Sequence, residues 1–549
     1  MGETFDYVVI GAGSAGSVLA GRLSEDGQHQ VCVLEAGGTD NTALVQCPAG
    51  IAGIAKSGRL SWGLQSVPQT GLNGRNSFQP RGKVLGGCSS VNAMIYLRGQ
   101  AQDYDGWAAE GNPGWAWEDV KPWFLKAQHN ERGADAFHAQ GGPLHVSDLQ
   151  QPNPLALDFV EAGVQAGYAR NPDFNGPWQE GVGLYQVTQK NGERCSAAKA
   201  YLTSHVQRSN LQVRTGAQVL RIVLTRTEDG LRATGVEYVC NGVRHTVHAR
   251  REVLLSAGAL LSPHILMVSG IGPAAHLQQV GVTPWLDLPG VGSHLQDHLD
   301  AIVICDAPGL TQSFGLSPTG VMHMARGVWQ WRRQRTGILT TNFAEGGAFL
   351  RSSPHEARPD LQLHFVVGKL VDHGRKTVWG HGFSCHVCVL RPQSRGTVRL
   401  RSADPLSLPA IDPNFLAADD DLQRTVRGVQ LMRHILAQPA LARHGAREMA
   451  ASAAAQTPDQ IAQWIRQSAD TIYHPVGTCR MGPGAQDVVD SQLRVHGVQG
   501  LRVVDASIFP HITSSNTNAP TIMVAEKAAA MVLEATHSKA VAAQPAAVV

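Results

Sequence analysis

The chain begins with the pattern that most limits its fold, a short apolar run followed at once by a glycine-rich loop. Residues 6–10 read DYVVI and predict a buried parallel strand. The next six residues, GAGSAG, match G-x-G-x-x-G directly before a helix that we expect over residues 14–23. A strand, a tight glycine turn and a helix in this order indicate a Rossmann-type α/β unit.

Each glycine of this loop has a physical role in dinucleotide binding. Gly11 permits the tight turn, Gly13 lets the backbone approach a pyrophosphate, and Gly16 lets the helix pack on the strand. A second strand, expected over residues 30–34, ends in Glu35, whose carboxylate can accept hydrogen bonds from a ribose diol. The pattern predicts a bound dinucleotide and leaves open whether it is a nicotinamide or a flavin.

Composition argues against several other kinds of protein. The 549 residues carry a formal net charge of +2 with 16% charged side chains, so no field of one sign attracts a nucleic acid. The nine cysteines show no disulfide framework, and we expect them to be reduced in a cytoplasmic protein. Cys385 and Cys388 resemble a redox or metal pair, but an offset of three on an expected strand puts them on opposite faces, so we predict no metal site.

Three further stretches bear on membranes and order. Apolar residues begin at Phe5 and break at a glycine after Ile10, which predicts no signal peptide. Residues 253–286 contain no Asp, Glu, Lys or Arg, yet three prolines divide them, so a buried strand, a turn and a helix fit better than a membrane span. Residues 536–549 predict a disordered tail.

A second glycine-rich segment, residues 80–92, narrows the identity of the dinucleotide. It reads PRGKVLGGCSSVN, and its backbone N–H groups suit a phosphate and a flat ring, although a plain surface turn would look similar. With this segment the chain resembles the glucose-methanol-choline (GMC) oxidoreductases, flavoproteins that oxidise alcohols with FAD. Further stretches that carry the resemblance are GALLSPHILMVSGIG at 258–272, YHPVGTCRMG at 473–482, VDASIFP at 504–510 and NTNAPT at 516–521. The likeness spans residues 4–534.

The resemblance implies an α/β fold in which a Rossmann-like FAD-binding domain is interleaved with an α+β substrate domain built on an antiparallel sheet. The FAD-binding domain would take residues 1–150, 191–298 and 470–535, and the substrate domain residues 151–190 and 299–469. Alternating runs at residues 361–366 and 397–401 predict strands of an antiparallel sheet with one solvent-facing side. Residues 521–533 predict a helix.

The resemblance also implies which residues contact FAD. They are Gly11, Gly13, Ser14, Ala15, Gly16, Glu35, Ala36, Arg81, Gly82, Val84, Gly86, Gly87, Ser89, Asn92, Ala93, Met94, Val219, Ala257, Asp505, Ala506 and Asn518. For Asn518 a turn before Pro520 is the alternative. Val91 replaces the histidine through which some members link FAD covalently, so we expect noncovalent FAD. His294 stands where an asparagine is usual, which questions a flavin contact there.

Alcohol oxidation needs a base that accepts the hydroxyl proton while the carbon-bound hydrogen leaves as hydride to flavin N5. Histidine titrates near neutral pH, which suits this task. The backbone around His474 is fixed by Pro475 and Gly477, and the resemblance implies that this histidine faces the flavin as the base; a packed core histidine is the alternative. The resemblance makes Asn516 its partner, because a neutral amide can orient the substrate oxygen.

The substrate is less constrained. Phe343 and Glu345 lie in the expected substrate domain, where Phe343 would line the pocket and Glu345 would meet a polar or cationic group. The chain resembles the primary alcohol dehydrogenases of alkane assimilation and polyethylene glycol dehydrogenases more than choline dehydrogenase. We therefore expect hydrophobic or aliphatic primary alcohols to be oxidised to aldehydes. Choline dehydrogenase, an oxygen-using alcohol oxidase, an enzyme for aromatic alcohols, and a hydroxynitrile lyase that leaves its FAD oxidised are the alternatives.

The resemblance to the alkane-assimilation type implies a quinone as electron acceptor and peripheral contact with the inner membrane. Residues 321–335 add one feature of their own, a helix that could lie in an interface. Its apolar side would carry Val321, Met324, Ala325, Val328 and Trp329 near Trp331, and its cationic edge Arg326, Arg332, Arg333 and Arg335. A helix packed on the protein's own core is the alternative.

Overall fold

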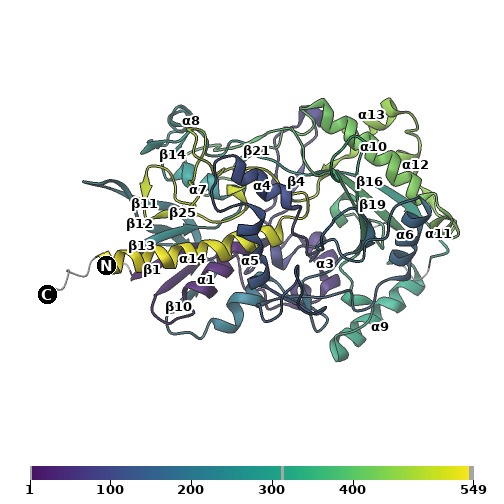
Figure 1. The fold of residues 1–549 in the computed structure, drawn as a ribbon, viewed down its shortest axis with the longest axis horizontal. Coiled ribbons are helices and arrows are strands. Elements are labelled where there is room, and N and C mark those ends of the chain that lie inside the picture. Colours follow the sequence, from purple (N-terminus) through teal and green to yellow (C-terminus); the bar gives the residue numbers. More distant parts are fainter. Residues whose placement is uncertain (1–2, 311–313, 377, 543–549) are drawn as a thin grey trace.

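Two large β-sheets organise the residues that the computed structural model describes, 3–310, 314–376 and 378–542 (Figure 1). The first sheet has the strand order β10-β2-β1-β13-β12-β11. These strands are β10 (Leu211–Arg214), β2 (Val31–Leu34), β1 (Glu3–Ile10), β13 (Val243–Leu255), β12 (Gly230–Cys240) and β11 (Gln218–Thr227), with β24 (Val498–Gln499) beside β12 and β25 (Leu501–Val503) beside β13. The neighbours from β10 to β13, and β25, run parallel, which confirms the Rossmann-type sheet.

The strand, turn and helix form where the glycine pattern predicts them. Helix α1 (Ser14–Leu23) follows β1 directly. Gly11 has a φ of 89°, and a Cβ on it would lie 2.6 Å from the carbonyl oxygen of Ser256. A Cβ on Gly16 would lie 1.8 Å from the carbonyl oxygen of Gly11. Only glycine fits at these two positions without moving the backbone.

The C-terminal helix is longer than the sequence predicts. Helix α14 (Asn518–Ala542) lies along α1, where Arg22 donates to both carboxylate oxygens of the buried Glu526, at 2.9 and 2.8 Å. Residues 536–542, which belong to the stretch for which we expect a disordered tail, continue this helix. Residues 543–549 of the predicted tail lie outside the described residues.

The second sheet is antiparallel in every strand pair and has the strand order β22-β16-β19-β18-β17-β7, with β23 beside β16. Its strands are β22 (Arg447–Glu448), β16 (Leu299–Asp306), β19 (Gly382–Val389), β18 (Leu361–Val366), β17 (Ala344–Leu350), β7 (Gly181–Leu184) and β23 (Asp470–Thr471). One face packs its apolar side chains, such as Leu363, Phe365 and Val387, against helices α6 (Pro154–Gln165), α10 (Asp419–Leu436) and α13 (Pro458–Ser468). This sheet confirms the predicted antiparallel layer.

The opposite face of this sheet is polar but not exposed to solvent, which corrects the expectation of one wet face. All six residues of β18 are buried, although Gln362 and His364 alternate with apolar neighbours as predicted. His364 lines a cavity, and Gln362 donates to Asn516, which lines the same cavity, so the alternation persists without exposure. The second predicted strand also differs, since β20 (Thr397–Arg399) pairs with β21 (Ala410–Asp412) in a separate two-stranded sheet.

Strand membership is interleaved along the chain. The strands of the first sheet come from residues 3–34, 211–255 and 498–503, and those of the second from residues 181–184, 299–306, 344–448 and 470–471. The domain boundaries that we expect stay a prediction.

The long uncharged stretch folds as a strand, a turn and short helices, as expected. It covers the end of β13, α7 (Ser262–Val268) and α8 (Ala274–Gln279). Of the helices in the described part of the chain, none combines the length and the apolar character needed to cross a membrane. All nine cysteines are free, and Cys385 and Cys388 are buried on strand β19 as predicted.

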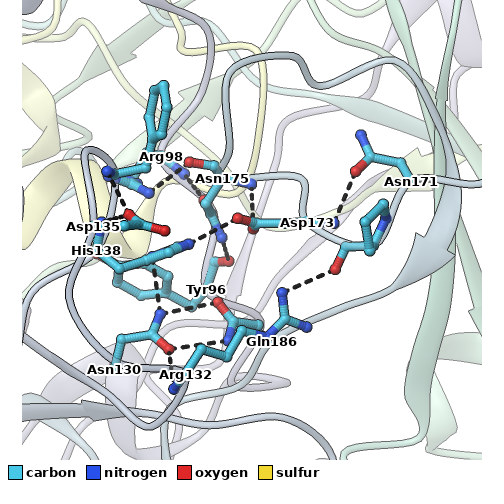
Figure 2. A network of polar contacts seen from close by, with 12 residues as sticks. Tyr96, Arg98, Asn130, Arg132, Asp135, His138, Asn171, Asp173, Asn175 and Gln186 are labelled. Atoms are coloured by element: carbon cyan, nitrogen blue, oxygen red, sulfur yellow. Dashed lines mark hydrogen bonds and ion pairs between the residues drawn. The ribbon is translucent and has the colours of Figure 1, made fainter.

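A buried polar network joins the edge of the second sheet to the preceding part of the chain (Figure 2). His138 Nε2 lies 2.7 Å from an Asp173 oxygen, and Arg98 donates to the carbonyl oxygen of Asn175 at 2.6 Å. Asn130 donates to Gln186 at 3.1 Å. These contacts bracket β7, so they fix the edge strand against residues 96–138.

Candidate active site

A cavity of about 670 Å³ lies between the two sheets and is lined by residues from both. Its size falls within the range of small-molecule and cofactor sites. On the side of the first sheet, the lining comes from the loops after β1, β2, β13 and β25, and from residues 80–94. On the side of the second sheet it comes from β16, β18 and β19.

Most of the residues that we expect to contact the cofactor line this cavity. They are Gly11, Gly13, Ser14, Ala15, Glu35, Ala36, Arg81, Gly82, Gly87, Asn92, Ala93, Met94, Val219, Ala257, Asp505, Ala506 and Asn518. Val91, in the position associated with covalent attachment, lines it too. His294 is not among the lining residues.

Four other expected cofactor residues, Gly16, Val84, Gly86 and Ser89, are not among the lining residues, and their contact with FAD stays a prediction. Gly16 holds α1 close to the turn, and Val84 is fully buried. Gly86 has a φ of 84°, and its carbonyl oxygen accepts a hydrogen bond from Ser89 Oγ at 2.6 Å. These residues shape the loops on which the lining residues stand.

Glu35 is buried at the end of β2 and organises the glycine loop. Its two carboxylate oxygens accept hydrogen bonds from the backbone N–H of Ala12, at 2.9 Å, and of Gly37, at 2.7 Å. Burial raises the pKa of Glu35, and the two hydrogen bonds act on this pKa in the opposite direction without cancelling the effect of burial. The carboxylate therefore holds the loop in place as well as facing the cavity, a structural role that the sequence does not reveal.

Two helices begin at the cavity side by side. Ser14 opens α1 and Asn518 opens α14, and the Ser14 hydroxyl donates to Asn518 Oδ1 at 2.7 Å. The N-terminus of each helix carries a partial positive charge and unpaired backbone N–H groups. Their convergence favours an anionic group such as a pyrophosphate.

A dinucleotide fits this side of the cavity. Gly13 lines it, and a Cβ built on Gly13 meets no atom nearer than 4.0 Å, so packing within the protein does not require glycine there. A glycine at such a place keeps space for a ligand that approaches the backbone. Together with the helix N-termini and the Glu35 carboxylate, this supplies what the phosphates and a ribose of FAD need.

His474 and Asn516 meet in the same cavity. Asn516 Nδ2 lies 3.0 Å from His474 Nε2, and the backbone N–H of His474 donates to Asp297 at 2.9 Å. Burial lowers the pKa of His474 well below its usual range, and nearby His298 and His364 act in the same direction. The imidazole is therefore neutral at pH 7 and free to accept a proton.

The structure adds residues that sequence reasoning missed. His298 Nδ1 lies 3.0 Å from His474 Nδ1, and Gln362 donates to Asn516 Oδ1 at 3.0 Å. Asp300, His364 and His386 line the cavity from three strands, and His386 Nδ1 lies 2.6 Å from an Asp300 oxygen. His298 lies in the same segment as His294, so sequence reasoning could have proposed it as a site residue. The other residues lie on strands β16, β18 and β19, and only strand pairing brings them together.

The two expected substrate residues have different positions. Phe343 lines the cavity with a φ of 65°, and its ring centroid lies 4.6 Å from that of Phe314. Glu345 is not among the lining residues, and its role toward a substrate stays a prediction. Its carboxylate is buried and accepts hydrogen bonds from Thr341 Oγ1, at 2.5 Å, and from the backbone N–H of Asn153, at 2.6 Å.

Comparison with known proteins adds independent findings. Residues 5–300 and 392–525 match two family profiles that are both described as GMC oxidoreductase. The chain is 45% identical over 535 residues to an alcohol dehydrogenase [acceptor] of Pseudomonas putida, which covers 96% of each chain. It is 43% identical to an oxygen-dependent choline dehydrogenase of Rhizobium johnstonii, over 96% of this chain and 95% of the relative. The structure resembles pyridoxine 4-oxidase from Mesorbium loti with a TM-score of 0.85 and 32% identity, over 96% and 99% of the two chains.

Proposed function

The chain belongs to the GMC oxidoreductase family and is an FAD-dependent oxidoreductase acting on alcohols, and from this premise we propose that it oxidises hydrophobic primary alcohols to aldehydes with His474 as the base. The observation that carries the proposal is the His474–Asn516 pair in the same cavity as the glycine loop. Bound FAD would supply the two-electron oxidant. The protein's own residues position the alcohol and hold its proton.

His474 Nε2 and Asn516 Nδ2 are 3.0 Å apart and in direct contact. In the proposed reaction the alcohol oxygen comes within hydrogen-bonding distance of both nitrogens from the cavity and replaces the hydrogen bond between them. The hydroxyl donates its proton to Nε2, and the Asn516 amide donates a hydrogen bond to the oxygen, which holds the reacting carbon in position. Because burial keeps His474 neutral, its lone pair is available at physiological pH. Asn516 has no proton to lose in this range, so it does not compete for the base.

Two substrate classes are favoured by different parts of the cavity. Phe314, Phe343 and Leu370 line it with apolar surface, which favours aliphatic or other hydrophobic primary alcohols. The Asp300 carboxylate and His386 on the sheet face favour a second candidate, a polar or cationic alcohol such as choline. Comparing the flavin reduction rates for 1-hexanol and choline separates the two.

The test of the function is anaerobic mixing with a panel of alcohols while flavin absorbance is followed. Bleaching by a primary alcohol supports the proposal. A hydroxynitrile lyase or a noncatalytic flavin protein would leave the flavin oxidised throughout. We also propose that FAD is noncovalent, since Val91 offers no nucleophilic atom; acid precipitation should release the yellow colour, and colour retained in the pellet would refute this.

We further propose that a quinone accepts the electrons at a membrane surface. Helix α9 (Pro318–Gln334) exposes Val321, Met322, Met324, Val328 and Trp329, and its residues include no Asp or Glu. Beyond the helix, Trp379 is 76% exposed. Met324 also lines the cavity, so the apolar surface borders the site.

The exposed face of α9 suits an anionic lipid surface better than the protein's own core. In Figure 1 the helix lies at the edge of the molecule, and only Gly327 and Trp331 of it are buried. Arg326, Arg332 and Arg333 are exposed and supply positive charge. Arg335 does not join them, because it pairs with Glu193 at 2.7 Å.

Sedimentation with anionic liposomes at low and moderate salt tests the contact with the membrane. Alcohol-dependent reduction of a soluble quinone analogue, compared with oxygen consumption, tests the acceptor. Fast peroxide formation without vesicle binding would make the protein an oxidase that does not use the membrane.

A further inference from the structure

The hydrogen bonds around His474 run in two chains, and each ends at a backbone carbonyl oxygen. One chain leaves Nδ1 of the imidazole and the other leaves Nε2. A carbonyl oxygen can only accept a hydrogen bond, so each chain has a direction that can be followed from its end back to the base. The tautomer of His474 is then open to deduction.

The chain that leaves His474 Nδ1 ends at the carbonyl oxygen of Leu390, and we follow it back from there. His298 Nε2 lies 2.9 Å from this oxygen, so the Nε2 atom must carry the proton. Burial lowers the pKa of His298 to about 4, so its ring is neutral and Nδ1 has only a lone pair. His474 Nδ1 lies 3.0 Å from that lone pair and must therefore be the N–H donor.

The chain that leaves His474 Nε2 ends at the carbonyl oxygen of Leu363. Tyr185 donates its hydroxyl proton to this oxygen at 2.6 Å, so its own oxygen accepts from Gln362 Nε2 at 3.2 Å. The same NH₂ group of Gln362 donates to Asn516 Oδ1 at 3.0 Å. The Asn516 NH₂ group then faces His474 Nε2, which must accept.

The two chains give the same answer independently. Each requires a proton on Nδ1 of His474 and a lone pair on Nε2. The reverse arrangement would turn a lone pair of His298 toward the Leu390 carbonyl oxygen, which cannot donate. It would also turn the Gln362 oxygen toward Tyr185, whose one hydroxyl proton is already donated to Leu363. Both changes leave polar atoms unpaired in a buried region, which is costly.

We propose that His298 is a positioning residue that, with Gln362, holds His474 in the one tautomer whose Nε2 can accept the alcohol proton. The inference rests on the proposed role of His474. As the alcohol O–H bond breaks, its proton bonds to Nε2, and the acceptor for the carbon-bound hydrogen and its electron pair would be bound FAD. The resulting imidazolium keeps its Nδ1–H bond to His298, which stabilises the charge without taking the proton.

The experiment compares two substitutions of His298 by stopped-flow flavin reduction in the FAD-loaded enzyme. His298→Leu removes the acceptor for the Nδ1–H of His474. His298→Asn can offer its Oδ1 close to the position of the lost Nδ1. We expect the limiting reduction rate to fall about 10- to 1,000-fold in the leucine variant, with a smaller change in the alcohol concentration for half-maximal rate, since a wrong imidazole tautomer costs up to about 10⁴-fold in a hydrolase triad. The asparagine variant should recover most of the rate.

Substitutions of Gln362 test the second chain, because they can change the donor at this position into an acceptor or remove it. Gln362→Glu keeps the size but replaces the donor with an acceptor, which should turn the Asn516 amide and present its oxygen to Nε2. Gln362→Met removes the donor without supplying an acceptor. We expect the glutamate variant to lose more of the limiting rate than the methionine variant.

The outcomes separate the two proposals. If His474→Ala lowers flavin reduction but both His298 variants match the wild type, the tautomer inference is wrong and the base stands. Equal losses in His298→Leu and His298→Asn, with unchanged FAD content and melting temperature, would also overturn it. If His474→Ala itself reduces flavin normally, the proposed base is wrong.

Discussion

Replacing Glu35 with alanine tests how far one buried carboxylate serves both the glycine loop and the cofactor. The change removes the acceptor for the backbone N–H groups of Ala12 and Gly37. Leaving a buried donor unpaired costs about 1–3 kcal/mol, and water that enters from the cavity relieves part of it, so we expect about 2 kcal/mol of lost unfolding free energy. Loss of a charge-assisted hydrogen bond to a ribose removes about 1.5–3 kcal/mol of binding, a 10- to 100-fold rise in the Kd for FAD.

Glu345→Ala is the matched control. Glu345 is also buried and accepts a hydrogen bond from a backbone N–H, that of Asn153, but it lies outside the cavity lining. It should lose similar stability in urea unfolding and bind FAD as the wild type does, when deflavinated protein is titrated and flavin fluorescence is followed. The reasoning is refuted if Glu35→Ala keeps the wild-type Kd, or if Glu345→Ala raises it equally.

Three further predictions follow from the site. His474→Ala should keep FAD but slow flavin reduction by about 10²- to 10⁴-fold, and Asn516→Ala should slow it less; a rate within threefold of wild type for His474→Ala excludes the base. Gly16→Ala should lower the melting temperature, because its Cβ would meet backbone at 1.8 Å, whereas Gly13→Ala, with no atom nearer than 4.0 Å, should fold normally and bind FAD weakly. Burial lowers the pKa of His364 to about 3, whereas in the unfolded chain its pKa is near 6.5. Below pH 6.5 the unfolded chain therefore binds a proton that the folded protein does not, so the free energy of unfolding falls as the pH falls from about 6.5 to 3. Between pH 7 and 5, protonation of His364 in the unfolded chain should lower the free energy of unfolding by about 2 kcal/mol. The variant His364→Gln should lose that much less stability over the same pH range, as measured by urea denaturation at each pH.

The cofactor side of the cavity was predictable because its residues stand in short contiguous motifs. A glycine turn between a strand and a helix places Gly11 and Gly13 without knowledge of any distant contact. The same motifs do not reveal which residues face the ligand. Gly86 and Ser89 belong to the second motif, yet they hydrogen-bond to each other beneath the cavity surface.

The substrate side could not be predicted in the same way, because it depends on strand register. His364 and His386 are partners across β18 and β19, and Asp300 reaches His386 from β16. No local pattern states that three strands from distant parts of the chain pair in this register. The position of Glu345 was equally hidden, since the strand register shifts between Ala344 and Gly346, and the Glu345 side chain is not among the cavity-lining residues.

The catalytic pair depends on both sheets. His474 follows β23, and Asn516 directly precedes α14, but the hydrogen-bond chains from them end at Leu363 within β18 and at Leu390 just after β19. The backbone of the second sheet therefore fixes the polarity of side chains that stand on neighbouring segments. A change that slips β18 by one residue would turn its side chains to the opposite face, and would remove Gln362 from Asn516 even though His474 and Asn516 were still present.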